Sequence, residues 1–468
     1  MAIARPWWHR VLVSLAASVG VAAVATSCAA SGVSLSAPPA CITGASSATS
    51  PAAEDRLVVL GRIITMDDPP IAEALLIEDG VVVAIGTRDE VLARSCEEVT
   101  VVDIGENVAY PGFIDAHAHW IGDREYYEIS SAAAAMDAAA ARGWTSISEQ
   151  WVDPGRLAEL EALAADDALP LRVDAYLALN APAPSGEHFG DWYSDREPGL
   201  VGDRLRVQGL KITLDNGWGT IFHWEPDDLT ETIGRANQAG WQVSVHTVST
   251  EAHEMVLDAF ETAIGATGNP LRHRIDHAIQ VTDEQLARMV AMDLATVIHL
   301  DGAATDWVLE AEYLDHFGPD NPGEETGWLA RWRDFVDAGL HVAAASDTPW
   351  LFPRFALADD IGRPVDQIAG GMDGRGRANP ETPDWVLDQL LTAEQGLRAV
   401  TVDAAHALGD EMRRGHLAPG TLGDVTILSG DVLSATPNEI RGMTVVATIV
   451  GGRVAHCADE HICSQLEE

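Results

Sequence analysis

Residues 112–119 read GFIDAHAH, a short apolar run that ends in two histidines. Seven more short apolar runs follow it: WTSIS (144–148), LRVDAYLAL (171–179), VQGLKITL (207–214), WQVSVH (241–246), HRIDHA (273–278), ATVIHL (295–300) and HVAAASD (341–347). Segments with helical periodicity, such as DEQLARMVAMD (283–293), separate them. This alternation predicts parallel strands with helical crossovers, and eight repeats over roughly 240 residues match the size of an α/β protein with a (β/α)₈ (TIM) barrel.

A second, smaller domain is expected from both ends of the chain. Hairpin-like strands with Gly or Asp turns precede the barrel in RLVVLGRIITMDD and ALLIEDGVVVAIG, and follow it in GDVTILSG and VVATIVGGRVA. We therefore predict a composite β-sandwich from residues 55–108 and 412–456. The barrel would occupy residues 109–411, and residues 457–468 would be a C-terminal tail.

The N-terminus has the pattern of a processing segment. Basic residues precede the apolar run VLVSLAASVGVAAVA, which is shorter than the ~20 residues needed to span a bilayer and suits a secretory signal over residues 1–28. The run ends in ATSC, which resembles the lipobox of bacterial lipoproteins and would make Cys28 the lipidated residue. We expect an exported protein, either a cell-envelope lipoprotein or a secreted one. The Ser-, Ala- and Pro-rich residues 29–54 would be a flexible tether.

The charge balance limits the partners of this protein. There are 72 acidic against 29 basic residues, a formal net charge of −43. Such a surface disfavours nucleic acid and anionic membrane faces, so the lipid at Cys28 would be the only membrane attachment. A small-molecule substrate is the expected partner, and homo-oligomer formation stays open.

The cysteines fit export. Without Cys28, four remain: Cys41, Cys96, Cys457 and Cys463. An even number in an exported chain is compatible with two disulfides, although the sequence alone leaves the pairing open. If the sandwich brings both chain ends together, Cys41 or Cys96 would pair with Cys457 or Cys463.

Potential metal ligands collect at the carboxyl ends of the predicted strands, where active sites of such barrels lie. They are His117, His119, Lys211, His246, His277 and Asp347. His117 and His119 are two residues apart, so a strand places both imidazoles on one face, where they can hold one ion. His273 and His277 are ~13 Å apart on a strand, too far to share an ion. We therefore take His277 as a ligand and His273 as structural.

Five motifs carry a family resemblance: PGFIDAHAH, the K-x-x-x-D-N-G around Lys211, VSVHTVS, RHRIDHA and ASDTPW. The stretches LTAEQGLRAVTVDAAHALG, GHLAPGTLGDVTIL and TIVGGRV after the barrel are similar too. Together they resemble the amidohydrolase superfamily, and most of all its amidohydrolase family 3, the YtcJ-like metal-dependent hydrolases. The chain departs from that pattern at Thr250, where relatives often carry an aspartate, so their substrates do not transfer directly.

The resemblance implies a binuclear metal site. His117 and His119 would bind one ion with Asp347, and His246 and His277 the second. Lys211, the only lysine of the chain, would bridge them as a carbamate formed with carbon dioxide, a reaction closed to arginine because it stays protonated. The ligands suit two zinc ions, while iron, manganese or cobalt would also fit.

The implied reaction is hydrolysis of an amide-type C–N bond by a metal-activated hydroxide, with Asp347 and Lys211 as the catalytic residues. One alternative is a mononuclear deaminase, or an ester or lactone hydrolase, of the same superfamily. The other is a non-catalytic exported binding protein. The substrate-binding residues are expected to be Trp120, Trp218, His223 and His299, which lie in loops or at strand ends on the catalytic side.

Overall fold

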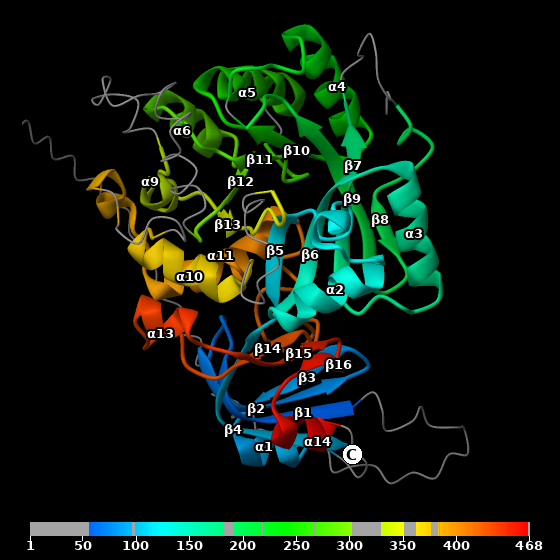
Figure 1. Cartoon of the computed structure of the whole chain (residues 1–468), viewed down its shortest axis with the longest axis vertical. Coiled ribbons are helices and arrows are strands. Elements are labelled where there is room, and N and C mark those ends of the chain that lie inside the picture. The colour runs from blue at the N-terminus through cyan, green and yellow to red at the C-terminus, as the bar shows by residue number, and fades with distance from the viewer. Residues whose placement is uncertain are drawn as a thin grey trace, which may run out of the picture. The chain divides into compact units, whose positions relative to one another are not determined.

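Eight parallel strands form a nearly closed barrel in the computed structural model (Figure 1). The structure describes residues 56–95, 99–180, 191–217, 219–265, 268–301, 329–350, 362–375, 382 and 384–466. The barrel strands are β5 (Phe113–Ala118), β6 (Trp144–Val152), β7 (Arg172–Leu179), β9 (Leu205–Thr213), β10 (Gln242–Thr247), β11 (Arg274–His277), β12 (Ala295–Ile298) and β13 (Val342–Ala344). Each of the eight apolar runs overlaps one of them, which confirms the barrel predicted from the sequence.

The barrel strands pair in chain order, and the last returns to the first. The neighbouring strands are hydrogen-bonded and parallel from β5 to β13, with the short strand β8 (Gly199–Val201) antiparallel to β9. Beyond β13, the backbone N–H of Asp347 donates to the carbonyl of His117 at 2.9 Å, and the N–H of His119 donates to the carbonyl of Thr348 at 2.9 Å. These two bonds bring the residues after β13 against the carboxyl end of β5.

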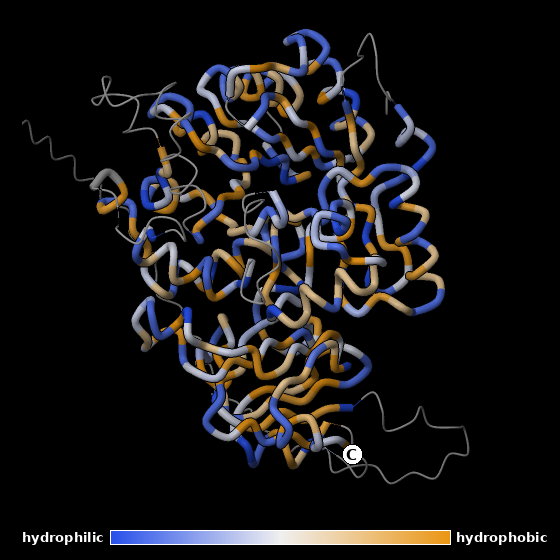
Figure 2. Tube along the Cα trace, viewed as in Figure 1, coloured by the Kyte–Doolittle hydropathy of each residue, from blue (hydrophilic) through white to orange (hydrophobic). Residues whose placement is uncertain are grey.

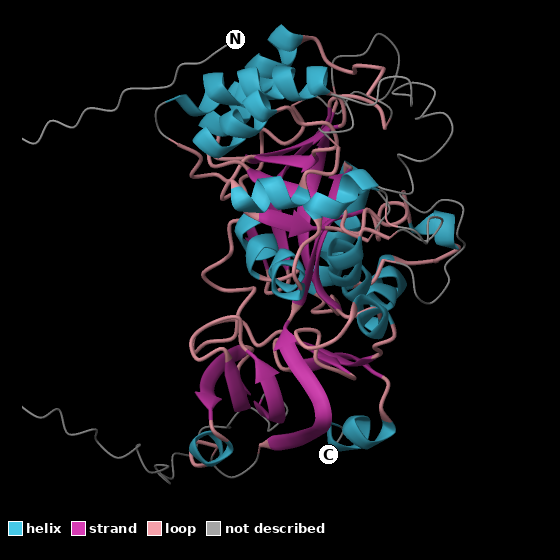
Figure 3. Ribbon diagram, turned by 90° about the vertical axis from the view of Figure 1, so that its left-hand side faces the viewer, coloured by secondary structure: helices cyan, strands magenta, loops and turns pink. Residues whose placement is uncertain are grey.

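Helices connect the strands and lie along their outer side (Figures 1 and 3). They are α2 (Ala132–Ala141), α3 (Pro154–Ala165), α4 (Pro226–Gln238), α5 (Thr250–Ile264), α6 (Asp283–Ala291), α9 (Trp332–Asp337), α10 (Pro364–Asp373), α11 (Ala393–Ala399) and α12 (Val402–Ala407), with 3₁₀ turns η2 (Arg124–Tyr127) and η5 (Asp384–Gln389). Local sequence sets several helix starts: Ser249 caps α5, and Thr282 with Gln285 forms a capping box on α6. Apolar residues of the helices and strands form one large buried cluster, and Figure 2 shows the hydropathy of each residue along the chain.

Strands from both chain ends form one seven-stranded sheet, in the order β16-β15-β14-β4-β1-β2-β3. These are β1 (Arg56–Ile64), β2 (Ile71–Glu78), β3 (Val81–Gly86), β4 (Thr100–Pro111), β14 (Val425–Leu428), β15 (Val445–Val450) and β16 (Arg453–Cys457). Helix α1 (Arg88–Leu92) packs against β1, β2 and β3, whereas α13 (Pro437–Arg441) packs against α10. Leu75 of β2 and Ile449 of β15 share one buried apolar cluster, although they lie in opposite halves of the sheet. The sheet therefore curls so that its two halves share a core, as expected for the predicted composite domain.

The join between sheet and barrel requires a glycine in the GFIDAHAH stretch. A Cβ on Gly112 would lie 2.2 Å from Thr145 Oγ1 and 2.7 Å from the Cβ of Asp424. The Gly112 N–H donates to the Asp424 carbonyl at 2.8 Å. The chain can thus pass from the sheet into β5 only with no side chain at this position.

The C-terminal residues correct two expectations. The predicted tail contains helix α14 (Glu460–Leu466), which begins where the Asp459 carboxylate accepts from the N–H groups of His461 and Ile462 and buries Ile462 in the sheet core. The proposed cross-pairing of cysteines is wrong, because Cys457 forms a disulfide with Cys463. The other three cysteines, at positions 28, 41 and 96, lie outside the described residues.

The N-terminal expectations are not tested by this structure. The predicted signal (1–28) and tether (29–54) lie outside the described residues. Among the helices that the structure describes, none has the length and apolar character required to cross a membrane.

Candidate metal-dependent active site

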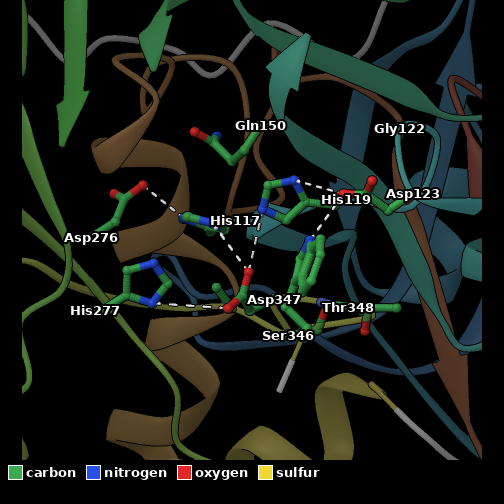
Figure 4. A network of polar contacts seen from close by, with 12 residues as sticks. His117, His119, Gly122, Asp123, Gln150, Asp276, His277, Ser346, Asp347 and Thr348 are labelled. Atoms are coloured by element: carbon green, nitrogen blue, oxygen red, sulfur yellow. Dashed lines mark hydrogen bonds and ion pairs between the residues drawn. The ribbon is translucent and has the colours of Figure 1, made fainter. Parts of the chain in front are cut away.

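Two groups of metal-binding side chains meet at the carboxyl ends of the barrel strands (Figure 4). One group is His117, His119 and Asp347; the other is His277, His299 and Asp347, and within each group the ligand atoms lie within 4.8 Å of one another. The structure thus brings together residues more than 200 positions apart in the sequence, and Asp347 belongs to both groups.

His117 and His119 face Asp347 from the end of β5. The Nε2 atoms of His117 and His119 lie 3.3 Å and 3.5 Å from Asp347 Oδ1. The register of β5 against β6 shifts between Asp115 and Ala118, so the simple alternation of the strand is interrupted there. Ala116 packs with Ala345 in an apolar cluster, whereas His117, the next residue, reaches Asp347 and Asp276. Because of this irregularity, Ala116 can pack in the apolar cluster while His117, the next residue, points to Asp347.

Left-handed backbone conformations accompany the two central ligands. His277 has φ 74° and Asp347 has φ 47°. These angles are uncommon for residues other than glycine, and such strain is found where the surrounding structure or function requires it. Both residues come directly at or after a strand end, so the turn redirects their side chains toward the site.

The hydrogen bonds around His117 and His277 determine which ring nitrogens remain free. Asp276 Oδ2 lies 2.7 Å from His117 Nδ1, so that nitrogen carries the proton and Nε2 keeps its lone pair. His299 Nδ1 donates to the Ala345 carbonyl at 2.9 Å, and its Nε2 therefore accepts from His277 Nδ1 at 2.8 Å. In both ligands the Nε2 atom is left available for an ion.

His246 completes the set from β10. Its ring centroid lies 4.3 Å from that of His277, and the His277 centroid lies 4.8 Å from that of His117. The Nε2 atom of His246 is buried and has no hydrogen-bond partner among the described residues; Asp215 Oδ1 is 3.8 Å away. An unpartnered buried imidazole nitrogen is costly unless a ligand binds in its vicinity.

Lys211 lies beside the site and pairs with Asp276. Its ammonium donates to Asp276 Oδ2 at 2.7 Å and approaches Ser244 Oγ at 3.5 Å. Asp276 is fully buried, and Arg274 Nε lies 3.0 Å from its other oxygen. One carboxylate thus joins His117, Lys211 and Arg274, side chains from three different strands.

Burial and neighbouring charges shift the pKa values of the site. Burial alone would raise the pKa of Asp347, but the imidazoles of His117, His119 and His277 hold it well below its usual range. Burial, together with the charge of Lys211, lowers the pKa of His246 to about 3. Burial and then Lys211 also lower the pKa of His117. Asp347 is therefore ionised, and the lowered pKa values of His117 and His246 favour their neutral forms, the states in which these groups bind metal.

The predicted substrate residues lie in different surroundings. Trp120 is fully buried in the barrel core, with its indole N–H donating to Asp115 at 3.1 Å, so its position does not support contact with substrate. His299 is buried behind His277, and His223 is exposed. Trp218 lies outside the described residues. His273 packs on Phe260 and accepts from the Val243 N–H at 3.0 Å, as a structural residue would.

Two buried carboxylates near the site were missed by sequence reasoning. Asp276 precedes His277 in HRIDHA, but only the fold shows that it contacts His117 and Lys211. Glu149, near the end of β6, accepts from the N–H groups of Gly122 and Ile121, and burial raises its pKa to about 7. The one sequence signal was an acidic residue at the end of a strand, which is common in barrels of any function.

The donor set fits a divalent ion. Neutral imidazoles with one carboxylate are the ligands that zinc and related ions prefer. The Nε2 atoms of His117 and His119 lie 3.3 Å and 3.5 Å from the ionised Asp347, and the buried Nε2 of His246 has no hydrogen-bond partner among the described residues. These residues therefore fit a metal site better than a structural polar core, in which every polar atom would have a hydrogen-bond partner.

A family model matches residues 122–456, described as the amidohydrolase family (Amidohydro_3). The match covers more than half of the chain. The chain belongs to the amidohydrolase family. The matched span begins just after His117 and His119, so these two ligands are supported by the geometry and the sequence motif rather than by the family match.

Several relatives of this amidohydrolase are known by sequence. YtcJ of Bacillus subtilis (strain 168), classed by its name among the amidohydrolases, is 26% identical over 280 residues, 55% of this chain and 48% of its own length. N-substituted formamide deformylase of Arthrobacter pascens is 27% identical over 49% of this chain and 39% of its own. The chain thus spans about half or less of these two relatives. Imidazolonepropionase of Symbiobacterium thermophilum is 25% identical over 81% of this chain and 88% of its own.

Solved structures share the fold. An uncharacterised metal-dependent hydrolase from Pyrococcus horikoshii OT3 superposes with a TM-score of 0.65 at 17% identity, covering 82% of this chain and 99% of that one. Molinate hydrolase superposes with a TM-score of 0.59 at 14% identity, covering 86% and 94%. At these identities the likeness supports the barrel and its attached sheet.

Proposed function

We propose that this amidohydrolase is a metal-dependent enzyme that hydrolyses an amide-type C–N bond of a small molecule. The observation that carries the proposal is the convergence of two donor groups on Asp347 at the carboxyl end of the barrel. The names of two relatives, a formamide deformylase and an imidazolonepropionase, support a C–N bond as the target.

The chain offers residues for two ions. His117 and His119 with Asp347 would hold one, and His246 and His277 the other. A bound divalent ion supplies an acidified water and polarises the scissile carbonyl. Zinc is the first candidate from the ligand types, with iron, manganese and cobalt as alternatives.

Asp347 is the proposed proton carrier. It is ionised, because nearby imidazoles hold its pKa well below the usual range against the effect of burial. Oδ1 faces His117 and His119, and Oδ2 lies 4.0 Å from His277 Nδ1. From this position Asp347 accepts the proton of the attacking water and delivers it to the leaving nitrogen.

His117 and His277 are kept in one orientation by their hydrogen bonds. Asp276 holds the Nδ1–H of His117, and His299 holds the Nδ1–H of His277. Rings fixed in this way present Nε2 to an ion without rearranging when the ion binds. His299 is therefore proposed to position a ligand rather than to contact substrate.

Lys211 is proposed to become the carbamate that bridges the two ions. Its Nζ lies 2.7 Å from the Asp276 oxygen that is also 2.7 Å from His117 Nδ1, so Lys211 lies beside the ligands of the site. Burial also lowers the pKa of Lys211 itself, favouring the neutral amine that reacts with carbon dioxide.

A mononuclear hydrolase of the same superfamily is the second candidate. The observation in its favour is the ion pair of Lys211 with Asp276 at 2.7 Å, which would neutralise an unmodified ammonium in the barrel interior. In that case Lys211 is a buried cation and one ion suffices.

The function is tested by metal content and hydrolysis together. Protein purified without chelators and supplied with bicarbonate should contain about two metal ions per chain, by mass spectrometry, and hydrolyse a member of a panel of formamides, N-acyl amino acids and cyclic amides. The Lys211→Ala variant should lose metal, while the exposed-site control Arg453→Met should not. About one ion per chain in both the wild type and Lys211→Ala would favour the mononuclear enzyme. No ion after zinc or manganese is supplied would overturn the catalytic proposal.

The carbamate can be tested directly because Lys211 is the only lysine. Protein equilibrated with ¹³C-bicarbonate should give a carbamate carbon signal in NMR spectra. That signal should vanish in Lys211→Arg and persist after the N-terminal amine is blocked. Its absence from metal-loaded wild-type protein would remove the bridge from the proposal.

Export with a lipid on Cys28 is also proposed, on the basis of the N-terminal sequence pattern alone. Metabolic labelling with a radioactive fatty acid in a bacterial host should label the wild-type chain. Labelling that survives in Cys28→Ala would contradict this site.

A further inference from the structure

Two exposed aromatic side chains lie beside the metal ligand His119. Trp350 is 45% exposed and Tyr126 is 64% exposed, and their ring centroids are 5.1 Å apart. The Trp350 centroid lies 6.4 Å from that of His119. We call Trp350 and Tyr126 the aromatic rim of the site.

The rim is held rigidly to the metal-binding residues. The Trp350 indole N–H donates to Asp123 Oδ2 at 2.9 Å, and the same oxygen lies 3.5 Å from His119 Nδ1. The Trp350 backbone N–H donates to the Asp347 carbonyl at 2.7 Å. Trp350 is thus tied to both His119 and Asp347, and its position relative to the reacting centre is set.

Trp350 is much more exposed than four other indoles of the barrel. Trp120, Trp144, Trp241 and Trp332 are all at most 2% exposed. The indole N–H of Trp350 is already bonded to Asp123. The exposed part of the side chain is therefore the apolar ring surface. A fixed indole with a free face stacks well on planar or aromatic groups.

The carboxylate of Asp123 beside the rim limits the charge of the substituent that can bind there. Asp123 contacts both the indole and His119, and its nearest cation, Arg156, lies 3.7 Å from its other oxygen. Arg156 also donates to the Gly122 carbonyl, so its charge is shared. A carboxylate on the substrate would be repelled here, whereas a neutral ring would not.

We propose that the aromatic rim binds a neutral aromatic or planar substituent of the amide substrate while the amide lies at the metal site. This inference rests on the proposed function for the location of the amide, and it adds the substrate class: amides bearing an uncharged ring on one side. Small aliphatic amides and amides with an anionic substituent would bind more weakly.

The test compares two metal-binding probes that differ only in the substituent, acetohydroxamate and benzohydroxamate. Calorimetry on the metal-loaded protein should show tighter binding of benzohydroxamate. In Trp350→Ala this preference should fall about two- to tenfold, since an aromatic contact contributes ~0.5–1.5 kcal/mol beyond the buried area. Trp350→Phe, which retains a ring, should keep most of the preference, and Met412→Ala, which removes a remote exposed apolar side chain, should keep all of it.

An unchanged preference in Trp350→Ala would overturn the rim proposal, provided that both probes still bind. Hydrolysis of N-benzylformamide and N-methylformamide then separates the two proposals. If neither is cleaved but the hydroxamate preference depends on Trp350, the rim stands and the hydrolase proposal loses support. If both are cleaved at equal efficiency in wild type and Trp350→Ala, hydrolysis stands and the rim is wrong.

Discussion

The two ends of the barrel both bury charge, but they arrange it differently. At the amino ends of the strands, Asp174 is bonded to Arg206 and Arg414, and Asp424 accepts two bonds from Arg172 at 2.7 Å and 2.9 Å. At the carboxyl ends, Asp347 faces imidazoles, and His246 Nε2 has no hydrogen-bond partner among the described residues.

The charge pairs at the amino end stabilise the fold, whereas the charged groups at the carboxyl end are available for function. At the amino end, guanidinium groups pair with the carboxylate oxygens of Asp174 and Asp424. The Arg172–Asp424 pair also joins the barrel to the seven-stranded sheet, because Asp424 directly precedes β14. At the carboxyl end the imidazole nitrogens of His117 and His119 lie 3.3 Å and 3.5 Å from Asp347, and a neutral imidazole nitrogen can offer its lone pair to an ion. A buried carboxylate thus has a structural role where arginine side chains surround it, and it is available for chemistry where histidine side chains surround it.

The largest expected effect is on activity at the carboxyl end. Asp347→Asn keeps the shape of the side chain but removes the charge and the proton acceptor. We expect kcat/KM to fall at least ~10³-fold, while the thermal midpoint changes little. Steady-state kinetics and thermal unfolding measure both quantities, with Asp167→Asn at an exposed position as the control. Near-normal activity in Asp347→Asn would remove this residue from the mechanism.

The reverse result is expected at the amino end. Arg414→Met leaves Asp174 and Asp410 short of a buried partner and should cost about 3–5 kcal/mol of the free energy of unfolding. Metal content of the folded fraction should not change. Arg453→Met, which removes an exposed ion pair with Asp167, should stay within about 1 kcal/mol of wild type. Chemical denaturation measures these values, and equal costs in the two variants would contradict the comparison.

A smaller effect is expected from Asp276→Asn, which weakens the hold on His117 Nδ1. Metal affinity should fall roughly 10–100-fold, as for other partners of metal-ligating histidines. Competition with a chelator measures the affinity, and circular dichroism checks the fold. Ser244→Ala, which removes one donor to the same carboxylate, should lose less. Unaltered affinity in Asp276→Asn would show that His117 is oriented by other contacts.

The smallest effect concerns pH. Burial lowers the pKa of His273 to about 4, and its Nδ1 already accepts from the Val243 N–H, so the folded state resists protonation. Its contribution to stability is therefore fully present above its usual pKa of ~6.5 and is lost as the pH falls from there toward ~4. His273→Gln should reduce the slope of stability against pH in this window by up to ~1.4 kcal/mol per pH unit. Denaturation at several pH values tests this, and an unchanged slope would contradict it.

Much of the site could be predicted because strand ends are local features. An apolar run followed by His or Asp marks a strand end wherever it occurs, and parallel strands bring such ends to one rim. That argument identified His117, His119 and Asp347, whose ligand atoms lie within 4.8 Å of one another in the structure. The seven-stranded sheet was expected for a similar reason, from hairpin patterns at both chain ends.

Other features depended on which side chains approach across the fold. Trp120 follows His119 directly and was expected at the pocket, but the chain turns it into the core, while Trp350 takes the exposed position. Cys457 pairs with a cysteine only six residues away because α14 folds back against β4. Neither outcome has a signal in local composition.

The sequence by itself determined the order of strands and helices, the metal-binding residue types at the strand ends and the unique lysine, because periodicity and spacing act over a few residues. Only the tertiary structure decided that Asp276 links Lys211 to His117, that His299 stands behind His277, and that Trp350 is the exposed ring beside the site. Such contacts join residues tens to hundreds of positions apart, and closure of the barrel sets their distances.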